Sequence, residues 1–152
     1  MADQEAGEQR QALTQSQYVR QFSGEHFGSL MGFRFELLVP GIAVISIHVE
    51  KKHLNPMGTL HGGVLMAMAD SAAGCACSYV DSVCPTVEGK LNFMIPAFAG
   101  DTVTATGKEI RHGATLLSGE VTITNQQGQV IAVGLYTYIR SHKKLPPVQA
   151  AG

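Results

Sequence analysis

The residue types best suited to chemistry lie in one short run, Asn55-Pro-Met-Gly-Thr-Leu-His61-Gly62-Gly63, which leads into a long apolar segment. Between His53 and Val80, the only Asp, Glu, Lys or Arg is Asp70. A lone carboxylate in such a stretch is costly unless it is hydrogen-bonded or faces a cleft. Asp70 is therefore a candidate catalytic carboxylate, with a satisfied polar group that fixes helix packing as the alternative.

The glycine pair at the start of this segment is suited to binding a developing negative charge. The first N–H groups of a helix have no partner within the helix, and the helix dipole favours anions there. Glycine at positions 62 and 63 lets another group approach the backbone closely. One donor to an oxyanion is worth about 2.7–4 kcal/mol. The alternative is that the glycines only allow a tight turn from loop to helix.

The spacing of Gly62 and Asp70 limits how they can act together. Eight residues of helix span roughly 12 Å, so one substrate carbonyl cannot contact both groups of the same helix. If both act on one bond, one of them must come from a second copy of the chain. We therefore expect two such helices to pack side by side and antiparallel in a homodimer, brought close by small residues: Ala67, Ala69, Ala73, Gly74 and Ala76.

The composition favours association between like copies and argues against nucleic acid as a partner. Charged residues make up 15% of the chain, against about 25% in a typical soluble domain. The net charge of −1 provides no electrostatic footprint for nucleic acid. The length of 152 residues predicts a single domain over 1–152, with a core at about 31–139 and flexible ends at 1–11 and 140–152.

The N-terminal segment and the cysteine content predict a cytoplasmic protein. The N-terminus is polar and lacks the apolar region of a signal peptide. The three cysteines, Cys75, Cys77 and Cys84, are an odd number and predict free thiols in a reducing compartment. The apolar segment 62–80 is long enough to span a membrane, but it is dominated by small residues and has Asp70 near its centre. We expect it to be a helix buried in protein, with no membrane association.

Hydrophobic periodicity and turn residues predict the order of the elements. The region between residues 13 and 30 suggests one or two short helices, and Pro40-Gly41 joins two alternating segments in a hairpin, 33–37 and 43–50. The long helix follows, and then a meander of four strands: 86–95, 101–111, 115–124 and 130–139. Such an order predicts an α+β fold in which an antiparallel sheet curls around one helix.

These features together resemble a known family. The order of the elements, the Asn55…His61-Gly62-Gly63…Asp70 constellation and the run from Thr86 to Ala97 are similar to the hotdog-fold thioesterases of the phenylacetate-degradation (PaaI-like) type. The resemblance covers about residues 31–139. It implies a long central helix wrapped by a curved antiparallel β-sheet, in a homodimer with shared active sites that pairs into a homotetramer. It also implies hydrolysis of an acyl- or aryl-coenzyme A thioester, with no metal and no cofactor.

The resemblance assigns a catalytic role to five residues of this sequence. Asp70 takes the place of the catalytic carboxylate, either as a general base on water or as a nucleophile. The N–H of Gly62 polarises the thioester carbonyl. Asn55 helps to place the attacking water or the thioester, and His61 shapes the turn and holds the substrate. Thr86 helps to orient the water.

Substrate-binding candidates are less specific. Gly63 lies beside the carbonyl site, and the cationic candidates for the coenzyme A phosphates are Lys90, Lys108, Arg111 and His112, each with an ordinary surface position as the alternative. Apolar side chains suit either an acyl pocket or the core: Phe33, Phe35, Met66, Met68, Phe93 and Met94. The remaining histidines carry no constellation; His48 and His53 are expected at the surface, and His26 in a short helix.

Two other functions stay open at this point. One is a non-catalytic acyl-coenzyme A-binding protein built on the same fold. The other is a hotdog hydratase or dehydratase, in which His61 and Asp70 would act on a β-hydroxyacyl chain. The identity of the acyl group is not predicted by the sequence.

Overall fold

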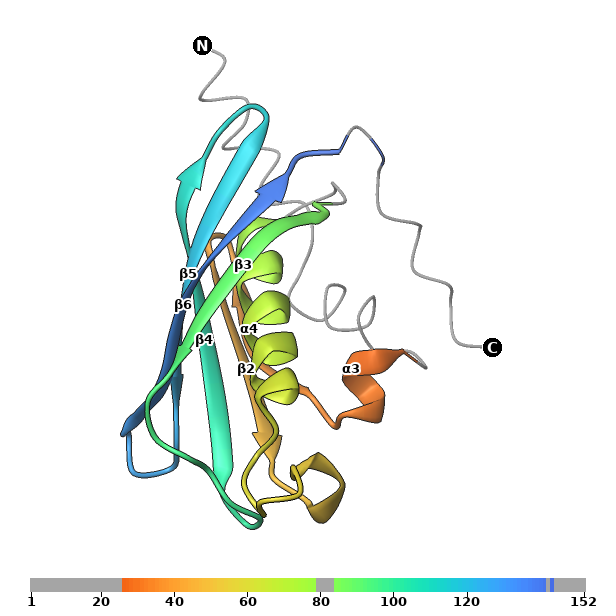
Figure 1. Cartoon of the computed structure of the whole chain (residues 1–152). Helices are drawn as coiled ribbons and strands as arrows, with labels where there is room; N and C mark the ends of the chain where they lie inside the picture. The colour runs from red at the N-terminus through yellow and green to blue at the C-terminus, as the bar shows by residue number, and fades with distance from the viewer. Residues whose placement is uncertain (1–25, 79–83, 142, 144–152) are drawn as a thin grey trace.

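A long helix lies against one face of a single antiparallel sheet (Figure 1). The computed structural model describes residues 26–78, 84–141 and 143. In chain order the elements are α3 (Phe27–Leu30), β1 (Arg34–Val39), β2 (Ile42–His48), the 3₁₀ helix η1 (Lys51–His53), α4 (Gly62–Cys77), β3 (Thr86–Phe93), β4 (Thr102–His112), β5 (Leu116–Thr124) and β6 (Val130–Ile139). The predicted α+β class, with one helix and one curved antiparallel sheet, is confirmed. The expected helices before residue 26 and most of the expected flexible ends lie outside the described residues.

The six strands are ordered β1-β2-β4-β5-β6-β3. The predicted hairpin joins β1 to β2, and β4, β5 and β6 form the predicted meander. The prediction was wrong for β3, which pairs with β6 at the far edge and not with β4. Eight residues, 94–101, connect β3 to β4. They can span about 26 Å, which is enough to pass three strand spacings of about 4.8 Å each.

The helix packs closely on the sheet because glycine stands at the points of contact. A Cβ at Gly107 on β4 would lie 2.4 Å from the Ala72 carbonyl of α4, and one at Gly119 on β5 would lie 3.2 Å from the Ala73 Cβ. The residues of α4 that face the sheet include Val64, Leu65 and Met68, all buried. The helix backbone therefore lies almost directly on β4.

The small residues of α4 do not all serve the helix pairing that the sequence predicts. Ala69, Ala73 and Ala76 have no exposed surface, because they face the chain's own sheet. For these three residues the prediction was wrong. The opposite side, which we call the open face of α4, consists of residues that stay half-buried or exposed: Gly63, Met66, Ala67, Asp70, Ser71, Gly74 and Ser78. Helix α3 lies on this side, away from the sheet (Figure 1).

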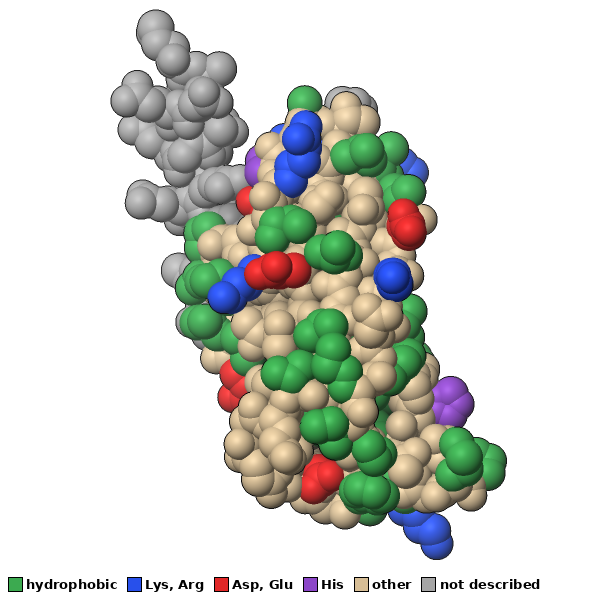
Figure 2. Space-filling model, turned by 60° about the vertical axis from the view of Figure 1, so that its left-hand side comes forward, with side chains coloured by type: hydrophobic (Ala, Val, Ile, Leu, Met, Phe, Trp, Pro, Cys, Tyr) green, Lys and Arg blue, Asp and Glu red, His purple; other side chains and the backbone are tan. Residues whose placement is uncertain are grey.

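The other face of the sheet points away from α4 and is rich in exposed apolar side chains. Leu116, Leu135 and Ile139 are between 41% and 57% exposed. Figure 2 shows hydrophobic side chains gathered in patches on this side, between isolated charged ones. In the described part of the chain, no helix is long and apolar enough to cross a membrane.

Candidate active site

The start of α4 is organised by His61, which caps the helix. The His61 Nδ1 atom accepts the Gly63 N–H at 2.8 Å, and the His61 carbonyl accepts the Val64 N–H at 2.9 Å. These contacts use the N–H groups of Gly63 and Val64. The Gly62 N–H, in contrast, has no acceptor among the described residues. The Phe93 ring lies beside it, 3.4 Å from where a Gly62 Cβ would be. Gly62 therefore offers one free amide at the positive end of a helix.

The side chain of Asn55 holds the loop that precedes this helix. Its Oδ1 atom accepts the Met57 N–H at 2.9 Å and the Thr59 N–H at 3.2 Å, and its Nδ2 atom donates to the Thr59 hydroxyl at 2.8 Å. A side-chain amide that replaces backbone contacts in this way is typical of Asx turns. Asn55, His61 and Gly62 together are the helix-end cluster.

Asp70 lies two turns further along α4 and is held by residues from two strands. The Thr86 hydroxyl of β3 donates to Asp70 Oδ1 at 2.9 Å. The Tyr138 hydroxyl of β6 lies 2.8 Å from the Asp70 main-chain oxygen and 3.2 Å from Oδ1. The lone carboxylate of the stretch from residue 53 to residue 80 is therefore hydrogen-bonded. Asp70, Thr86 and Tyr138 are the mid-helix cluster.

A cavity of about 390 Å³ opens beside the mid-helix cluster. Asp70, Thr86 and Tyr138 are in its wall. The other described lining residues come from the segment 26–35 around α3, from the second half of α4 and its C-cap, and from the segment before β3: His26, Phe27, Gly28, Phe33, Phe35, Ser71, Gly74, Cys75, Ser78 and Cys84. This is room for an apolar acyl group next to a carboxylate. Burial, and then the charge of Asp70, raise the pKa of the Cys75 thiol to about 12, so this thiol is neutral and not a nucleophile.

The predicted catalytic residues thus fall into two places within one chain. The structure brings Thr86 to Asp70, and it groups Asn55, His61 and Gly62 at the start of the helix. None of the helix-end cluster is among the described residues that line the cavity. The two parts are separated by eight residues of one continuous helix, or roughly 12 Å.

Comparison with known proteins identifies the family. Residues 57–132, half of the chain, match the family model described as "Thioesterase superfamily". The chain belongs to the thioesterase superfamily. Human acyl-coenzyme A thioesterase 13 is 33% identical over 101 residues, which cover 64% of this chain and 72% of that protein.

Solved structures of similar proteins extend this result to the fold. The PaaI protein of the E. coli phenylacetic acid degradation operon superposes with a TM-score of 0.81 at 25% identity, covering 86% of this chain and 95% of that one. A protein of Streptococcus mutans UA159, solved bound to acetyl-coenzyme A, superposes with a TM-score of 0.70 at 26% identity, covering 73% of this chain and 90% of that one. The predicted PaaI-like resemblance and hotdog fold are confirmed.

The cationic candidates of this thioesterase-superfamily chain do not surround the cavity. Lys90 pairs across the strands with Leu135, Leu135 with Glu120, and Glu120 with Lys108. This row is exposed and lies on the sheet face that points away from α4. Lys90 and Lys108 are therefore on the opposite side of the sheet from Asp70 of the same chain, and their role in phosphate binding stays a prediction.

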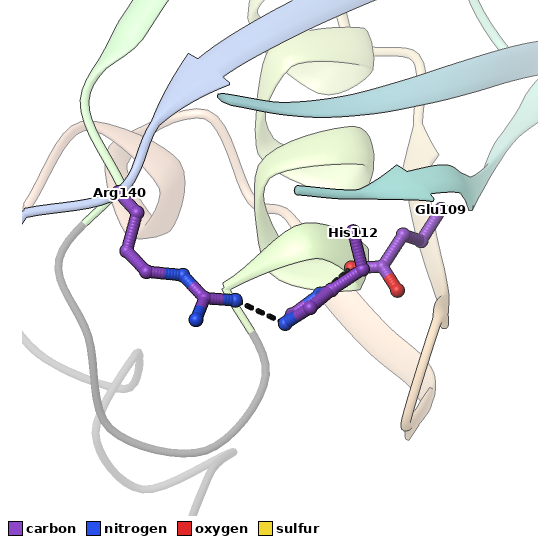
Figure 3. Close-up of polar contacts among 3 residues, drawn as sticks. All are labelled: Glu109, His112 and Arg140. Atoms are coloured by element: carbon purple, nitrogen blue, oxygen red, sulfur yellow. Dashed lines mark hydrogen bonds and ion pairs between the residues drawn. The ribbon is translucent and has the colours of Figure 1, made fainter. Parts of the chain in front are cut away.

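His112 takes part in a polar chain of its own (Figure 3). One ring nitrogen, Nδ1, lies 2.6 Å from Glu109 Oε2, and the other, Nε2, contacts the Arg140 guanidinium. An arginine can only donate, so Nε2 accepts and Nδ1 donates to the carboxylate. Both nitrogens of His112 are thus engaged within the chain. Its neighbour Arg111 is exposed, and the assignment of either residue to a phosphate stays a prediction.

The apolar candidates divide between cavity, core and surface. Phe33 and Phe35 line the cavity, whereas Met68 is fully buried in the core and Met66 is packed against it. Phe93 lies on Gly62, and Met94 is exposed. Of these candidates, the cavity is therefore lined by Phe33, just before β1, and by Phe35 on β1, and by none of the methionines.

Three residues near these sites were missed or misplaced by sequence reasoning. His53 is only 1% exposed, so its predicted surface position was wrong. Its Nδ1 atom accepts the Glu50 N–H at 2.9 Å, and its carbonyl accepts the His61 N–H at 2.9 Å. Burial, and then the charge of Lys52, lower its pKa. His26 lines the cavity and Tyr138 contacts Asp70; for Tyr138, the alternation of β6 was the available signal.

Proposed function

We propose that the protein hydrolyses acyl- or aryl-coenzyme A thioesters to the free acid and coenzyme A. The observation that carries the proposal is the Asp70 carboxylate, hydrogen-bonded by Thr86 at 2.9 Å in the wall of a cavity of about 390 Å³. The similar proteins named above support it: one is an acyl-coenzyme A thioesterase and another was solved bound to acetyl-coenzyme A. No metal or cofactor is part of the proposal.

Asp70 activates the water or attacks the thioester itself. As a general base it takes a proton from a water molecule, whose oxygen bonds to the thioester carbon; the C–S bond then breaks, and the proton passes to the coenzyme A thiolate. As a nucleophile it forms a mixed anhydride with release of coenzyme A, and water then hydrolyses the anhydride. In both routes Oδ1 is held by Thr86, and Oδ2, which has no hydrogen-bond partner among the described residues, is the reacting oxygen.

The Gly62 amide polarises the carbonyl in an active site shared by two copies of the chain. Roughly 12 Å of helix separates it from Asp70, and the described lining of the cavity includes no residue of the helix-end cluster. The open face of α4 is half-buried at Ala67 and Gly74. An antiparallel partner helix on this face would bring the free Gly62 N–H of one copy toward Asp70 of the other.

The rest of the surface supports further association. Strand β3 is an edge of the sheet, and Val87 and Phe93 on it are more than half exposed. Unpaired strand edges are ready to pair with another chain. The apolar outer face of the sheet (Figure 2) suits the contact between two dimers, in a homotetramer. The three free cysteines suit the cytoplasm.

The helix-end cluster binds the reacting end of the substrate. Among the described residues, only one N–H of the Asn55 amide has an acceptor, the Thr59 hydroxyl, and the second N–H helps to place the water or the thioester. His61 accepts through Nδ1, so the ring hydrogen is on Nε2, and this N–H holds the substrate. Gly63 has no Cβ, so the substrate can approach the backbone there closely. Arg111, Lys90 and Lys108 are exposed cations for the phosphates of coenzyme A.

The proposal is tested by thiol release from a panel of aryl, short-chain and long-chain acyl-coenzyme A thioesters. We expect at least one to be hydrolysed by the wild-type protein and Asp70→Asn to lose at least about a hundredfold in kcat, the lower range for acid–base groups. Unchanged melting and assembly state would show that the variant is folded. Binding of thioesters without thiol release would indicate the non-catalytic alternative. Hydration of an enoyl thioester without thiol release would indicate a hydratase.

A further inference from the structure

The hydroxyl of Tyr138 reaches the catalytic turn of α4 from the inner face of the sheet. Tyr138 and Thr86 are directly opposite each other on β6 and β3, so the sheet register places both beside Asp70. Thr86 contacts Oδ1 alone, whereas the Tyr138 hydroxyl lies 2.8 Å from the main-chain oxygen and 3.2 Å from Oδ1. One phenol thus touches both the backbone and the carboxylate of the same residue.

A glycine in the helix makes this approach possible. Gly74 lies one turn after Asp70, in the interior of α4. Glycine at an interior helix position costs about 0.5–1 kcal/mol relative to alanine, so its presence calls for a reason. An added Cβ would lie 3.3 Å from Tyr138 Cε1 and 3.6 Å from its hydroxyl oxygen. The ring occupies the space that a larger residue at position 74 would need.

We propose that Tyr138 is a positioning residue for Asp70, and that Gly74 is glycine because it gives the Tyr138 ring access to the carboxylate. The inference rests on the proposed function, in which Asp70 is the reacting group. With Oδ1 contacted by two hydroxyls, the carboxylate is fixed in one orientation and Oδ2 faces the cavity. Tyr138 acts through Asp70 and takes no part in bond making.

The environment of Tyr138 keeps its hydroxyl a donor. The side chain is 1% exposed. Burial, and then the charge of Asp70, raise the pKa of Tyr138 far above its ordinary value. The phenol therefore stays protonated over the whole range in which a thioesterase would be assayed. Its proton is available to either oxygen of Asp70 that it contacts.

Tyr138→Phe tests the hydroxyl, and Tyr136→Phe is its matched control. Tyr136 is equally buried on the same strand, with its ring stacked at 6.5 Å from that of Tyr138, but its hydroxyl contacts Met66 and not Asp70. We expect Tyr138→Phe to lower kcat about tenfold or more with KM nearly unchanged, because a hydrogen bond to a charged group is lost. The acidic limb of kcat/KM should move to higher pH in this variant. Tyr136→Phe should keep the wild-type kcat and pH profile.

Gly74→Ala tests the access of the ring without changing Tyr138. We expect a fall in kcat of several-fold although alanine favours the helix, so melting should not show a matching loss. If Gly74→Ala acts through Tyr138, the double variant with Tyr138→Phe should be no worse than Tyr138→Phe alone. Additive losses in the double variant would overturn the link between the two residues.

A readout that needs no turnover separates this inference from the proposed function. The Asp70 carboxyl carbon resonance, followed by NMR in labelled protein, should shift in Tyr138→Phe and Gly74→Ala and stay unchanged in Tyr136→Phe. An unchanged resonance in Tyr138→Phe, or equal kinetics for the two tyrosine variants, would overturn the positioning role. Equal thiol release by wild type and Asp70→Asn would instead overturn the proposed function, while the resonance would still report on Tyr138.

Discussion

The two clusters on α4 are built in different ways. In the helix-end cluster, Asn55 and His61 make side-chain hydrogen bonds to residues no more than four positions away. In the mid-helix cluster, the partners of Asp70 are 16 and 68 positions away, on β3 and β6. The first is fixed by a local turn, whereas the second exists only when the whole sheet has formed. An active site shared by two copies would combine the helix-end cluster of one chain with the mid-helix cluster of the other. Its two halves would then depend on different parts of the fold.

The two clusters also supply opposite chemistry. The helix-end cluster presents a free N–H at the positive end of a helix, which suits an oxygen that gains negative charge. The mid-helix cluster presents a carboxylate oxygen, which suits a proton or an electrophilic carbon. Neither cluster by itself has both parts that hydrolysis of a thioester requires.

The largest effect among the following variants is expected at the helix end, from Gly62→Ala. A Cβ there would lie 3.4 Å from the Phe93 ring and would crowd the approach to the Gly62 N–H. We expect kcat to fall by up to about a hundredfold, since removal of one oxyanion donor costs about 10²–10³. Melting should stay the same or rise, because alanine is the better helix former. Unchanged steady-state kinetics in a folded Gly62→Ala variant would show that this amide faces elsewhere.

A smaller effect is expected in the mid-helix cluster from Thr86→Val. The variant keeps the shape of the side chain and loses the hydrogen bond to Asp70 Oδ1 at 2.9 Å. We expect kcat to fall about tenfold, and Thr86→Ser to retain most of the activity because the hydroxyl is kept. Thr106→Val is the matched control, since Thr106 lies on β4 between the buried Ala105 and Gly107 and faces away from α4. Equal kcat values for Thr86→Val and Thr106→Val would show that the Thr86 hydroxyl plays no part in the reaction.

The smallest effect is expected from the buried His53, which precedes the helix-end cluster, and it is a pH dependence of the free energy of unfolding. Because burial lowers its pKa below the unfolded value of 6.5, the unfolded chain takes up a proton that the folded chain refuses as the pH falls. The contribution of His53 to the free energy of unfolding is therefore fully present above about pH 6.5. It is lost as the pH falls below this value, and the total loss is about 1.4 kcal/mol for each unit by which the pKa is lowered.

Urea unfolding at pH 7.5 and 5.5, at one protein concentration, measures this loss. In His53→Gln the difference between the two pH values should shrink. The exposed His48 provides the control, and His48→Gln should behave as the wild type does. A pH dependence that is the same in all three proteins would contradict the role given to His53.

The elements and the local part of the site could be predicted from the sequence because their signals are local. The alternation of apolar residues predicted both ends of β6 to the exact residue, and the glycine pair predicted that α4 starts at Gly62. The family resemblance gave Thr86 the role of orienting the water, but its contact with Asp70 was not predicted, since no local pattern joins residues 16 positions apart.

What could not be predicted depends on packing across the sheet. Strand β3 lies beside β6 because the connection 94–101 is long enough to pass β6 and β5 before β4 begins. The sequence of this connection does not distinguish such a crossing from a turn between neighbouring strands. The burial of His53 and the contact of Tyr138 with Asp70 both arise from elements that meet only in the folded chain. Ala69 and Ala73 were assigned to a partner helix because small residues suit either neighbour. Both are fully buried within the chain, and a Cβ at Gly119 on β5 would lie 3.2 Å from the Ala73 Cβ, so the sheet is the neighbour that they face.

The most direct test of the account is activity restored by mixing two inactive variants, Asp70→Asn and Gly62→Val. If each site takes its amide from one copy and its carboxylate from the other, a mixed dimer has one site with both lesions and one site with neither. Random pairing makes half of the dimers mixed, so co-refolding should restore up to about a quarter of the wild-type thiol release. Each variant refolded alone, and shown to be folded, is the control. Mixed dimers that form and show no activity above these controls would contradict the shared site.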